Sequence, residues 1–390
     1  MSSNEVEKSC RVCTQSELIP IFESSGDFSF TSAQTPVPLK IRVAFCRSCG
    51  HAQTPPLDNI AEYYDTSYNF RNRNPEEDDI YIATNDHIIF RSDHQAAVIE
   101  SKIDLSKPLR ILDYGCAKAS SLRKLSERHP NVIPYAFDVS EAYVPSWNHF
   151  IPKERQAPYQ LPDGWNGHLD VVLSLFSLEH VDDPRGFVRV LRQLLRTNGR
   201  VHLIVPNLYQ NVSDLLVADH VNHFSPSSLR RLFQDAGFSE IQIDTESHRA
   251  ALIVSAVLGT GSSVAAPASP NDIAQTETSA RTIAANWKSS AAKIRSFEHN
   301  GKRHKTAIYG SGVYGLFIAS TLSSLDDVAY FVDMNPFRQG LTLLDRQVIA
   351  PQDLENDVDA VLVGLNPQYA REIIAQTSSL HTVERDFVFL

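Results

Sequence analysis

The chain has 390 residues, a length that suits two or three domains. Hydrophobic residues make up 42% of the chain and charged residues 21%, a balance typical of a globular protein. Its formal net charge of -10 argues against duplex nucleic acid as a partner, because phosphate binding depends on clustered lysine and arginine. No apolar run approaches the roughly 20 residues of a membrane span, and residues 1–8 lack the pattern of a secretory signal. We therefore expect a cytoplasmic protein with no membrane or nucleic-acid partner.

Residues 1–75 are expected to form a small β-rich module that binds zinc. Residues 39–45 alternate apolar and polar side chains, which is the period of a strand. Four of the five cysteines form two Cys-x-x-Cys pairs, namely Cys10, Cys13, Cys46 and Cys49. Four thiolates complete the tetrahedral coordination of Zn²⁺ and leave no position for water, so this metal is predicted to be structural. The adjacent His51 is expected to lie at the surface.

Residues 76–258 predict a doubly wound α/β domain. A helix is expected over 86–102, another over 184–195 with Asn198-Gly199 as its stop, and a third over 226–236 with Ser225 as its cap. Short apolar runs predict strands between helices, at 109–115, 132–137, 171–176 and 200–205. This alternation predicts a parallel sheet covered on both faces.

Residues 259–300 are expected to form a linker, rich in Gly, Ser, Ala and Pro up to position 270, followed by a helix over 272–298. A Rossmann-like domain is expected over 301–390. There, Gly310-Ser311-Gly312-Val313-Tyr314-Gly315 follows a strand and opens a helix, and Asp333 falls at the end of the next strand. This pattern alone would suggest a bound dinucleotide.

The end of the first strand of the middle domain carries a candidate ligand site. Gly115 and Ala117 are small, so the backbone there can approach a ligand, and Asp113 can contact it; a tight strand-to-helix turn is the alternative. Asp138 ends the second strand, where an acid can accept hydrogen bonds from ribose hydroxyls. Phe176 ends a further strand beside the same cleft.

Read in order, these motifs resemble class I S-adenosylmethionine-dependent methyltransferases. The resemblance rests on Asp113-Tyr114-Gly115, on Asp138, and on Asp170-Val171-Val172 leading to Leu178-Glu179-His180-Val181 with Pro184. It implies a sulfonium cofactor, with Gly115 near its amino-acid part and Asp138 on its ribose.

The loop before residue 225 is expected to carry the base. Methyl transfer to carbon or oxygen needs a base near the acceptor, and imidazole titrates in a suitable range. His220 is the candidate base, and Asp219 or Glu179 can orient it. His223 and Glu179 are candidate substrate contacts. The alternative is that His220 and His223 only anchor the loop to the sheet.

Almost the whole chain resembles three-domain sugar C-methyltransferases, which act on nucleotide-linked ketosugars. The resemblance rests on the cysteine pairs with Phe45-Cys46-Arg47-Ser48-Cys49-Gly50-His51, on Asp219-His220 before Phe224-Ser225, and on Val332-Asp333-Met334-Asn335-Pro336. It implies that Asp219, His220 and His180 lie at the acceptor, that carbon beside a ketone is deprotonated, and that the C-terminal domain helps to hold the nucleotide substrate.

Three other functions remain as alternatives. The family has tyrosines at the positions of Val217 and His223, and the absence of these phenol groups leaves O-methylation of a sugar or another small metabolite open. A binding protein that has kept the fold without catalysis is a second alternative. An NAD-dependent sugar oxidoreductase that uses the C-terminal turn is the third.

Overall fold

A computed structural model describes residues 9–58, 78, 80–83, 87–259, 269–299 and 305–390. The contacts divide the chain into two compact units. The first comprises the described residues of 1–20, 44–214 and 220–279, and the second comprises 21–43, 215–219 and those of 280–390. This division does not follow the expected boundaries at 75 and 258, because the cysteine pairs belong to the same unit as the middle domain. Most of the expected linker, 260–268, lies outside the described residues.

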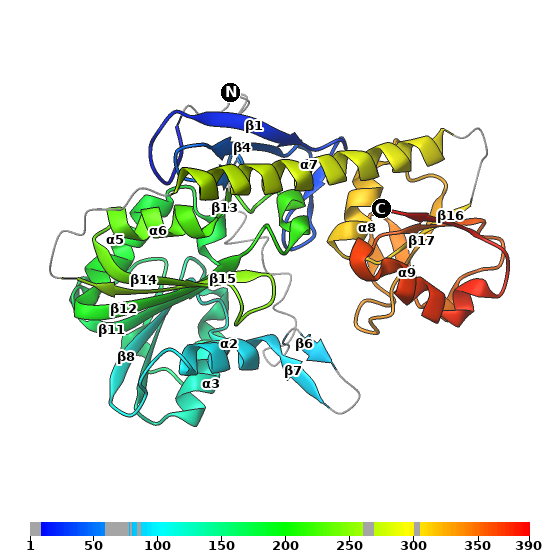
Figure 1. Cartoon of the computed structure of the whole chain (residues 1–390). Coiled ribbons are helices and arrows are strands. Elements are labelled where there is room, and N and C mark those ends of the chain that lie inside the picture. The colour runs from blue at the N-terminus through cyan, green and yellow to red at the C-terminus, as the bar shows by residue number, and fades with distance from the viewer. Residues whose placement is uncertain (1–8, 59–77, 79, 84–86, 260–268, 300–304) are drawn as a thin grey trace. The chain divides into compact units, whose positions relative to one another are not determined.

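A seven-stranded sheet forms the centre of the first unit (Figure 1). Its strand order is β10-β9-β8-β11-β12-β15-β14. Five strands run parallel, as the sequence predicts, whereas β15 pairs antiparallel with both of its neighbours. The bounds are β8 Leu109–Tyr114, β9 Val132–Asp138, β10 Gln156–Pro158, β11 Leu169–Leu175, β12 Leu195–Pro206, β14 Phe238–Asp244 and β15 Ala251–Leu258.

Helices cover both faces of this sheet, because its central strands are apolar on both sides. In β8, Ile111 packs in the same cluster as helices α2 and α3, whereas Leu112 packs with α5 and α6 on the other face. This confirms the expected doubly wound fold. The helices are α2 Arg91–Glu100, α3 Ser120–Arg128, α4 Val144–Trp147, α5 Pro184–Leu194 and α6 Pro226–Asp235.

Two helical expectations need correction at their ends. The helix expected from residue 86 begins only at Arg91, because Ile88–Phe90 forms strand β7, which pairs with β6, Ile80–Ala83. Helix α5 ends at Leu194 and runs directly into β12, so Asn198 is not its stop and lies within the strand with a φ of 60°. The cap at Ser225 is confirmed, since its side chain accepts a hydrogen bond from the Ser228 backbone.

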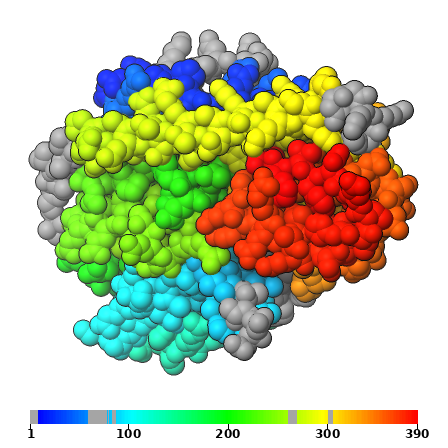
Figure 2. Space-filling view, turned by 45° about the vertical axis from the view of Figure 1, so that its right-hand side comes forward, coloured from blue at the N-terminus to red at the C-terminus, as the bar shows by residue number. Residues whose placement is uncertain are grey.

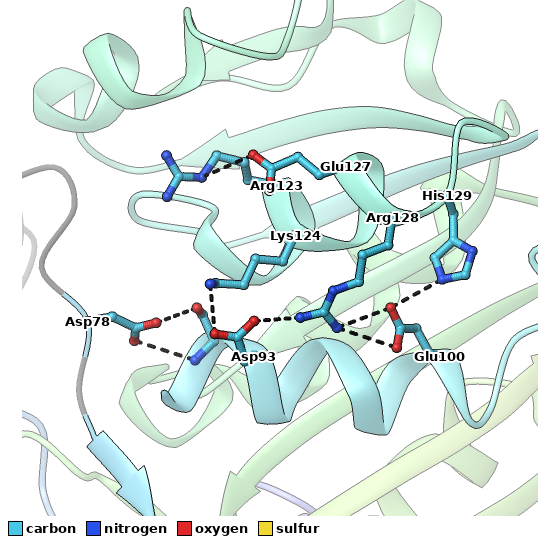
Figure 3. A network of polar contacts seen from close by, with 9 residues as sticks. Asp78, Asp93, Glu100, Arg123, Lys124, Glu127, Arg128 and His129 are labelled. Carbon is cyan, nitrogen blue, oxygen red and sulfur yellow. Dashed lines mark hydrogen bonds and ion pairs between the residues drawn. The ribbon is translucent and has the colours of Figure 1, made fainter. Parts of the chain in front are cut away.

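Ionic contacts join α2 to α3 on the outside of the domain (Figure 3). Asp93 of α2 lies 2.8 Å from the Lys124 ammonium and also pairs with Arg128 of α3. At the other end of α2, Glu100 pairs with Arg128 at 3.3 Å and with His129 at 3.1 Å. The network fixes the helix that precedes β8 against the helix that follows it.

The N-terminal residues form a second, smaller sheet with the order β1-β4-β5-β13. Strand β13, Asn222–His223, comes from the loop that follows β12 and pairs antiparallel with β5. The catalytic candidates Asp219 and His220 therefore lie just before a strand of the β-rich module, and the substrate candidate His223 lies on that strand. The other strands of this sheet are β1 Leu18–Glu23, β4 Arg42–Cys46 and β5 Ala52–Gln53, while β2 Ser29–Phe30 and β3 Pro36–Val37 form a separate pair.

Helix α7, Pro270–Glu298, confirms the helix expected at 272–298. Its buried apolar side chains are mostly three, four or seven positions apart, at Ile273, Ala280, Ile283, Ala284, Trp287, Ala291 and Ile294. This spacing is that of one apolar stripe. The opposite side is exposed, and Figure 2 shows it as a continuous yellow band on the surface.

The second unit contains a six-stranded sheet of order β18-β19-β17-β16-β20-β21, parallel except for β18. Helix α8 follows β16 across the glycine turn, as the sequence predicts. Within the described ranges, no helix combines the length and apolar character needed to cross a membrane. The bounds are β16 Thr306–Tyr309, α8 Val313–Thr321, β17 Val328–Val332, β18 Thr342–Leu343, β19 Arg346–Ile349, β20 Ala360–Val363, α9 Pro367–Gln376 and β21 Asp386–Phe389.

Candidate active site

A cavity of about 530 Å³ opens at the carboxyl ends of β8, β9 and β11. This is the edge of a doubly wound sheet where ligands bind. Its wall includes four of the predicted cofactor contacts together with Phe176 and His180, so the structure brings these residues to one place. The predicted cofactor contacts in the wall are Asp113, Gly115, Ala117 and Asp138, and Phe176 was predicted to join them.

The turn after β8 has the backbone of a glycine-rich loop although it holds only one glycine. Gly115 has a φ of 74°, and a Cβ atom there would lie 2.6 Å from the Ser177 hydroxyl. Ala117 and Ala119 have φ angles of 45° and 53°, in the left-handed region that L-residues adopt only at a cost of roughly 1–2 kcal/mol. The turn therefore keeps the shape that admits a ligand.

Two buried acids face this cavity. Burial raises the pKa of Asp113 to about 7, with a further contribution from the charge of Asp138. The Oδ1 atom of Asp113 is buried and has no hydrogen-bond partner among the described residues. Burial also raises the pKa of Asp138 to about 6, although its Oδ2 atom accepts a hydrogen bond of 2.7 Å from the Ala117 backbone. Both acids are thus placed to gain from a bound cation.

Arg91 is a further residue of the cavity, which sequence patterns did not single out. Its guanidinium carbon lies 4.1 Å from the ring centroid of Phe176. Phe176 itself has a φ of 58°, which turns its ring at the end of β11. Arg91 is the first residue of α2, and a single arginine at the start of a helix gives no sequence signal. With Lys118, which also lines the cavity, Arg91 therefore adds cationic side chains to a wall that holds two buried acids.

Histidines gather beside the cavity. His180, which lies in its wall, has its ring centroid 4.7 Å from that of His220. The Nδ1 atom of His220 donates to Oδ1 of Asp214 at 2.6 Å, and Nδ1 of His223 donates to Oδ2 at 2.7 Å. Asp214 is 1% exposed. Although burial alone would raise it, the two imidazoles hold the pKa of Asp214 well below its usual range. One buried carboxylate therefore fixes both rings.

Two expectations about this loop differ from the structure. The carboxylate that orients His220 is Asp214, whereas Asp219 accepts hydrogen bonds from the backbone and hydroxyl of Ser32, at 2.6 and 2.8 Å. Asp219 and His220 are neighbours in the sequence, but their side chains contact different partners. The expectation that Asp219 orients His220 therefore differs from the structure. His223 is fully buried, and its Nε2 atom lies 3.3 Å from the Thr54 hydroxyl, so it anchors the loop and does not face the cavity.

Glu179 is not part of the cavity wall, although it was expected to contact the substrate. It is 1% exposed, and its Oε2 atom has no hydrogen-bond partner among the described residues. Burial raises the pKa of Glu179 to about 7, and the His220 charge opposes this rise. Its Oε1 atom lies 4.0 Å from Nε2 of His180. The carboxyl group is therefore buried next to His180 and is not part of the cavity wall.

The four cysteines form one buried cluster. The sulfur atoms of Cys10 and Cys49 are 3.6 Å apart, and those of Cys13 and Cys46 are 3.5 Å apart. All four sulfur atoms lie within 4.8 Å of one another. Zinc–sulfur bonds of about 2.3 Å in a tetrahedron require sulfur atoms slightly less than 4 Å apart, so the cluster is compatible with zinc. His51 is fully buried and not at the surface; its Nε2 atom lies 3.2 Å from Asn222.

Strand β13 links the cysteine module to the histidines. Asn222 on this strand donates to the backbone oxygens of Leu178 and Val181, at 3.2 and 2.7 Å, which flank Glu179 and His180. Arg11, between the first two cysteines, donates to the Val221 oxygen at 2.8 Å. The module therefore supports both segments that carry the histidines.

The C-terminal glycine turn has its own internal contacts. Asp333, expected at the position of a ribose-binding acid, accepts hydrogen bonds from the backbone and hydroxyl of Ser311, at 2.9 and 2.5 Å. Arg338 donates to the Ser311 oxygen at 2.9 Å. The acid thus stabilises the turn itself.

Comparisons with known proteins place the cavity in a recognised domain. Residues 90–243 match the family model of a methyltransferase domain. The ubiquinone biosynthesis O-methyltransferase of Idiomarina loihiensis is 27% identical over 169 residues, which cover 37% of this chain and 68% of that protein. The segment that matches the family model, 90–243, includes the glycine turn, both acids and the histidine cluster.

Two solved structures have low similarity to the chain. An S-adenosylmethionine-dependent methyltransferase from Mesorhizobium loti is 14% identical, with a TM-score of 0.35 over 42% of this chain and 97% of that one. The CurJ carbon methyltransferase is 12% identical, with a TM-score of 0.36 over 42% of this chain and 54% of that one.

Proposed function

We propose that this S-adenosylmethionine-dependent methyltransferase methylates a nucleotide-linked sugar, at a carbon atom that His220 deprotonates. The observation that carries the proposal is the position of the histidines. His180 lies in the wall of the cavity, and the neighbouring His220 is fixed through Nδ1 by a buried carboxylate. The cavity would hold the cofactor, and the acceptor would lie beside the histidines.

The residues of the cavity fit S-adenosylmethionine. Arg91 offers a cation for its carboxylate, Asp113 and Asp138 offer anions for its ammonium and ribose groups, and the Gly115 turn gives close backbone approach. The orphaned Oδ1 atom of Asp113 is a further sign that a donor or cation completes the site. When bound, the cofactor supplies a methyl group that is already activated.

The orientation of His220 defines its chemical role. Because a carboxylate only accepts hydrogen bonds, Nδ1 of His220 carries a proton, and Nε2 is the atom that can take one from the acceptor. Asp214 stabilises the imidazolium that results, and we propose it for the role first given to Asp219. His180 is the second polar group at the acceptor. Holding both reactants in one geometry supplies much of the acceleration.

The test is a reaction with a panel of nucleotide sugars, analysed by mass spectrometry, with the new methyl group located by NMR. We expect His220→Ala to lower turnover by roughly 10²- to 10⁴-fold, the usual contribution of a general base, with little change in affinity for S-adenosylhomocysteine. His129→Asn, which alters an imidazole outside the cavity, is the matched control and should retain turnover. Weak cofactor binding by His220→Ala would assign the residue a structural role instead.

O-methylation is the second candidate, and the similarity to an O-methyltransferase favours it. The same NMR experiment separates the two, because a methyl group on oxygen and one on carbon have distinct chemical shifts and couplings. An NAD-dependent oxidoreductase has less support, since Asp333 is engaged by Ser311. Calorimetric titration that detects no S-adenosylhomocysteine binding would favour a non-catalytic binding protein.

A further inference from the structure

The geometry points to a second metal site in this protein, formed by Glu179, His180 and His220. One ligand atom from each of the three residues lies within 4.8 Å of the other two. A site of two imidazoles and one carboxylate suits Zn²⁺ and other divalent transition metals, and leaves further coordination positions open. The site is separate from the cysteine cluster, which has four thiolates of its own.

The carboxyl group of Glu179 is the first reason to expect a cation. It is 1% exposed, and its Oε2 atom has no hydrogen-bond partner among the described residues. A buried carboxylate oxygen without a partner is costly unless the group is protonated, paired or bound to a metal ion. The two imidazoles beside it are metal ligands in their neutral form.

The second reason is the support of His220. A histidine that binds a metal through one nitrogen usually donates the other N–H to a carboxylate, which fixes the ring and makes it more basic. Asp214 accepts this hydrogen bond from Nδ1 at 2.6 Å and is itself held by His223 at 2.7 Å. Nε2 is therefore the nitrogen that would bind the metal.

This inference rests on the proposed function, because both use Nε2 of His220. An ion on that nitrogen excludes the proton that His220 must accept from the acceptor. A divalent transition metal should consequently inhibit methyl transfer reversibly, by competing with the proton transfer and not with the cofactor.

The first experiment counts the metal-binding sites of the full chain. One equivalent of Zn²⁺ is added first, to fill the cysteine cluster. Co²⁺ is then added and followed by calorimetry and visible absorption. We expect one further equivalent to bind without sulfur-to-metal charge-transfer bands, since no thiolate belongs to this site. Glu179→Gln and His180→Asn should each weaken this binding at least tenfold, and Asp214→Asn by roughly 10- to 100-fold. His129→Asn is the control and should bind Co²⁺ like the wild type.

Absence of a further equivalent in the folded wild type, or equal binding by Glu179→Gln, would overturn the site. Turnover of the wild type is then measured with Co²⁺ and again after Co²⁺ has been removed by dialysis. Reversible inhibition supports the inference. Activation would support the site but contradict the base role of His220, whereas lack of methylation under every condition would contradict the proposed function alone.

Discussion

Asp113 and Asp138 give the cofactor cavity a protonation state that depends on pH near neutrality. Burial raises the pKa of Asp113 to about 7 and that of Asp138 to about 6. Because these folded-state values exceed the unfolded ones, the stabilising contribution of each group to the empty protein is complete at low pH and is lost as pH rises through its folded pKa. A cationic ligand has the opposite preference, since it attracts the ionised acids.

We therefore expect the affinity for S-adenosylmethionine to rise with pH. From pH 6 to pH 8, ionisation of Asp113 should strengthen binding roughly tenfold. Calorimetric titration at both pH values measures this, and Asp113→Asn should lose most of the dependence. Glu127→Gln, an exposed acid on α3, is the control. An unchanged pH dependence in Asp113→Asn would place its origin elsewhere.

At the residue scale, sequence patterns identified two acids that the structure places in the wall of one cavity, but not every contact of the histidines. Asp113, Asp138 and His180 follow strand ends, and strand ends converge at one edge of a parallel sheet. The orienting role of Asp214 depends on the path of an irregular loop, which brings Nδ1 of His220 within 2.6 Å of its carboxylate and has no periodic signal. Similarly, the alanines of the turn adopt left-handed angles that their residue type does not predict.

The α2–α3 pair shows how elements around the cavity are held. Asp93 is the centre of the network in Figure 3, because it contacts both Lys124 and Arg128. Its side chain is 31% exposed, which limits each pair to a modest contribution. The network nevertheless fixes α2, whose first residue is Arg91 of the cavity.

Asp93→Asn should destabilise the protein by about 1 kcal/mol, the sum of two partly exposed ion pairs. Glu127→Gln is the matched control from the same network; its carboxylate is 65% exposed and 4.0 Å from Arg123, so its effect should be near zero. Chemical denaturation in low and high salt measures both. An effect of Asp93→Asn that does not shrink in high salt would argue against an ionic origin.

At the element scale, the sequence predicted the central strands and most helices because their apolar periods are clear. It did not predict that residues 88–90 form a strand or that β15 is antiparallel. Strand β7 depends on its pairing with β6, and the direction of β15 depends on its pairing with β12. The spacing of apolar residues along the chain does not encode such pairings. Strand β13 has only two residues, which is too short for an alternating apolar pattern to predict it.

In the first unit as a whole, the cysteine cluster is part of the main hydrophobic core and not an appendage. Cys10, Cys13, Cys46 and Cys49 pack in the same cluster as Phe224 and Leu178. This explains why the unit division does not isolate residues 1–75, a boundary that composition suggested but contacts do not follow. A zinc ion there would stabilise the domain that holds the cofactor.

We expect the double substitution Cys46→Ser with Cys49→Ser to abolish tight zinc binding and to destabilise the protein by several kcal/mol, because a structural metal contributes directly to folding. Metal analysis and thermal unfolding measure the two effects. Cys116→Ser is the control, since the fifth cysteine lies in the cofactor cavity, away from the cluster. Full zinc content in the double variant would mean that the cysteines are not its ligands.

The pairing of β13 with β5 has a physiological consequence. The base that we propose lies two residues before a strand whose partner begins three residues after Cys49 of the cysteine cluster. If the cluster holds zinc, oxidants that modify the thiolates, or chelators that remove the metal, should thus lower activity without reaching the reaction centre. Methylation capacity in the cell would then follow zinc supply and thiol redox state, even with ample cofactor and acceptor.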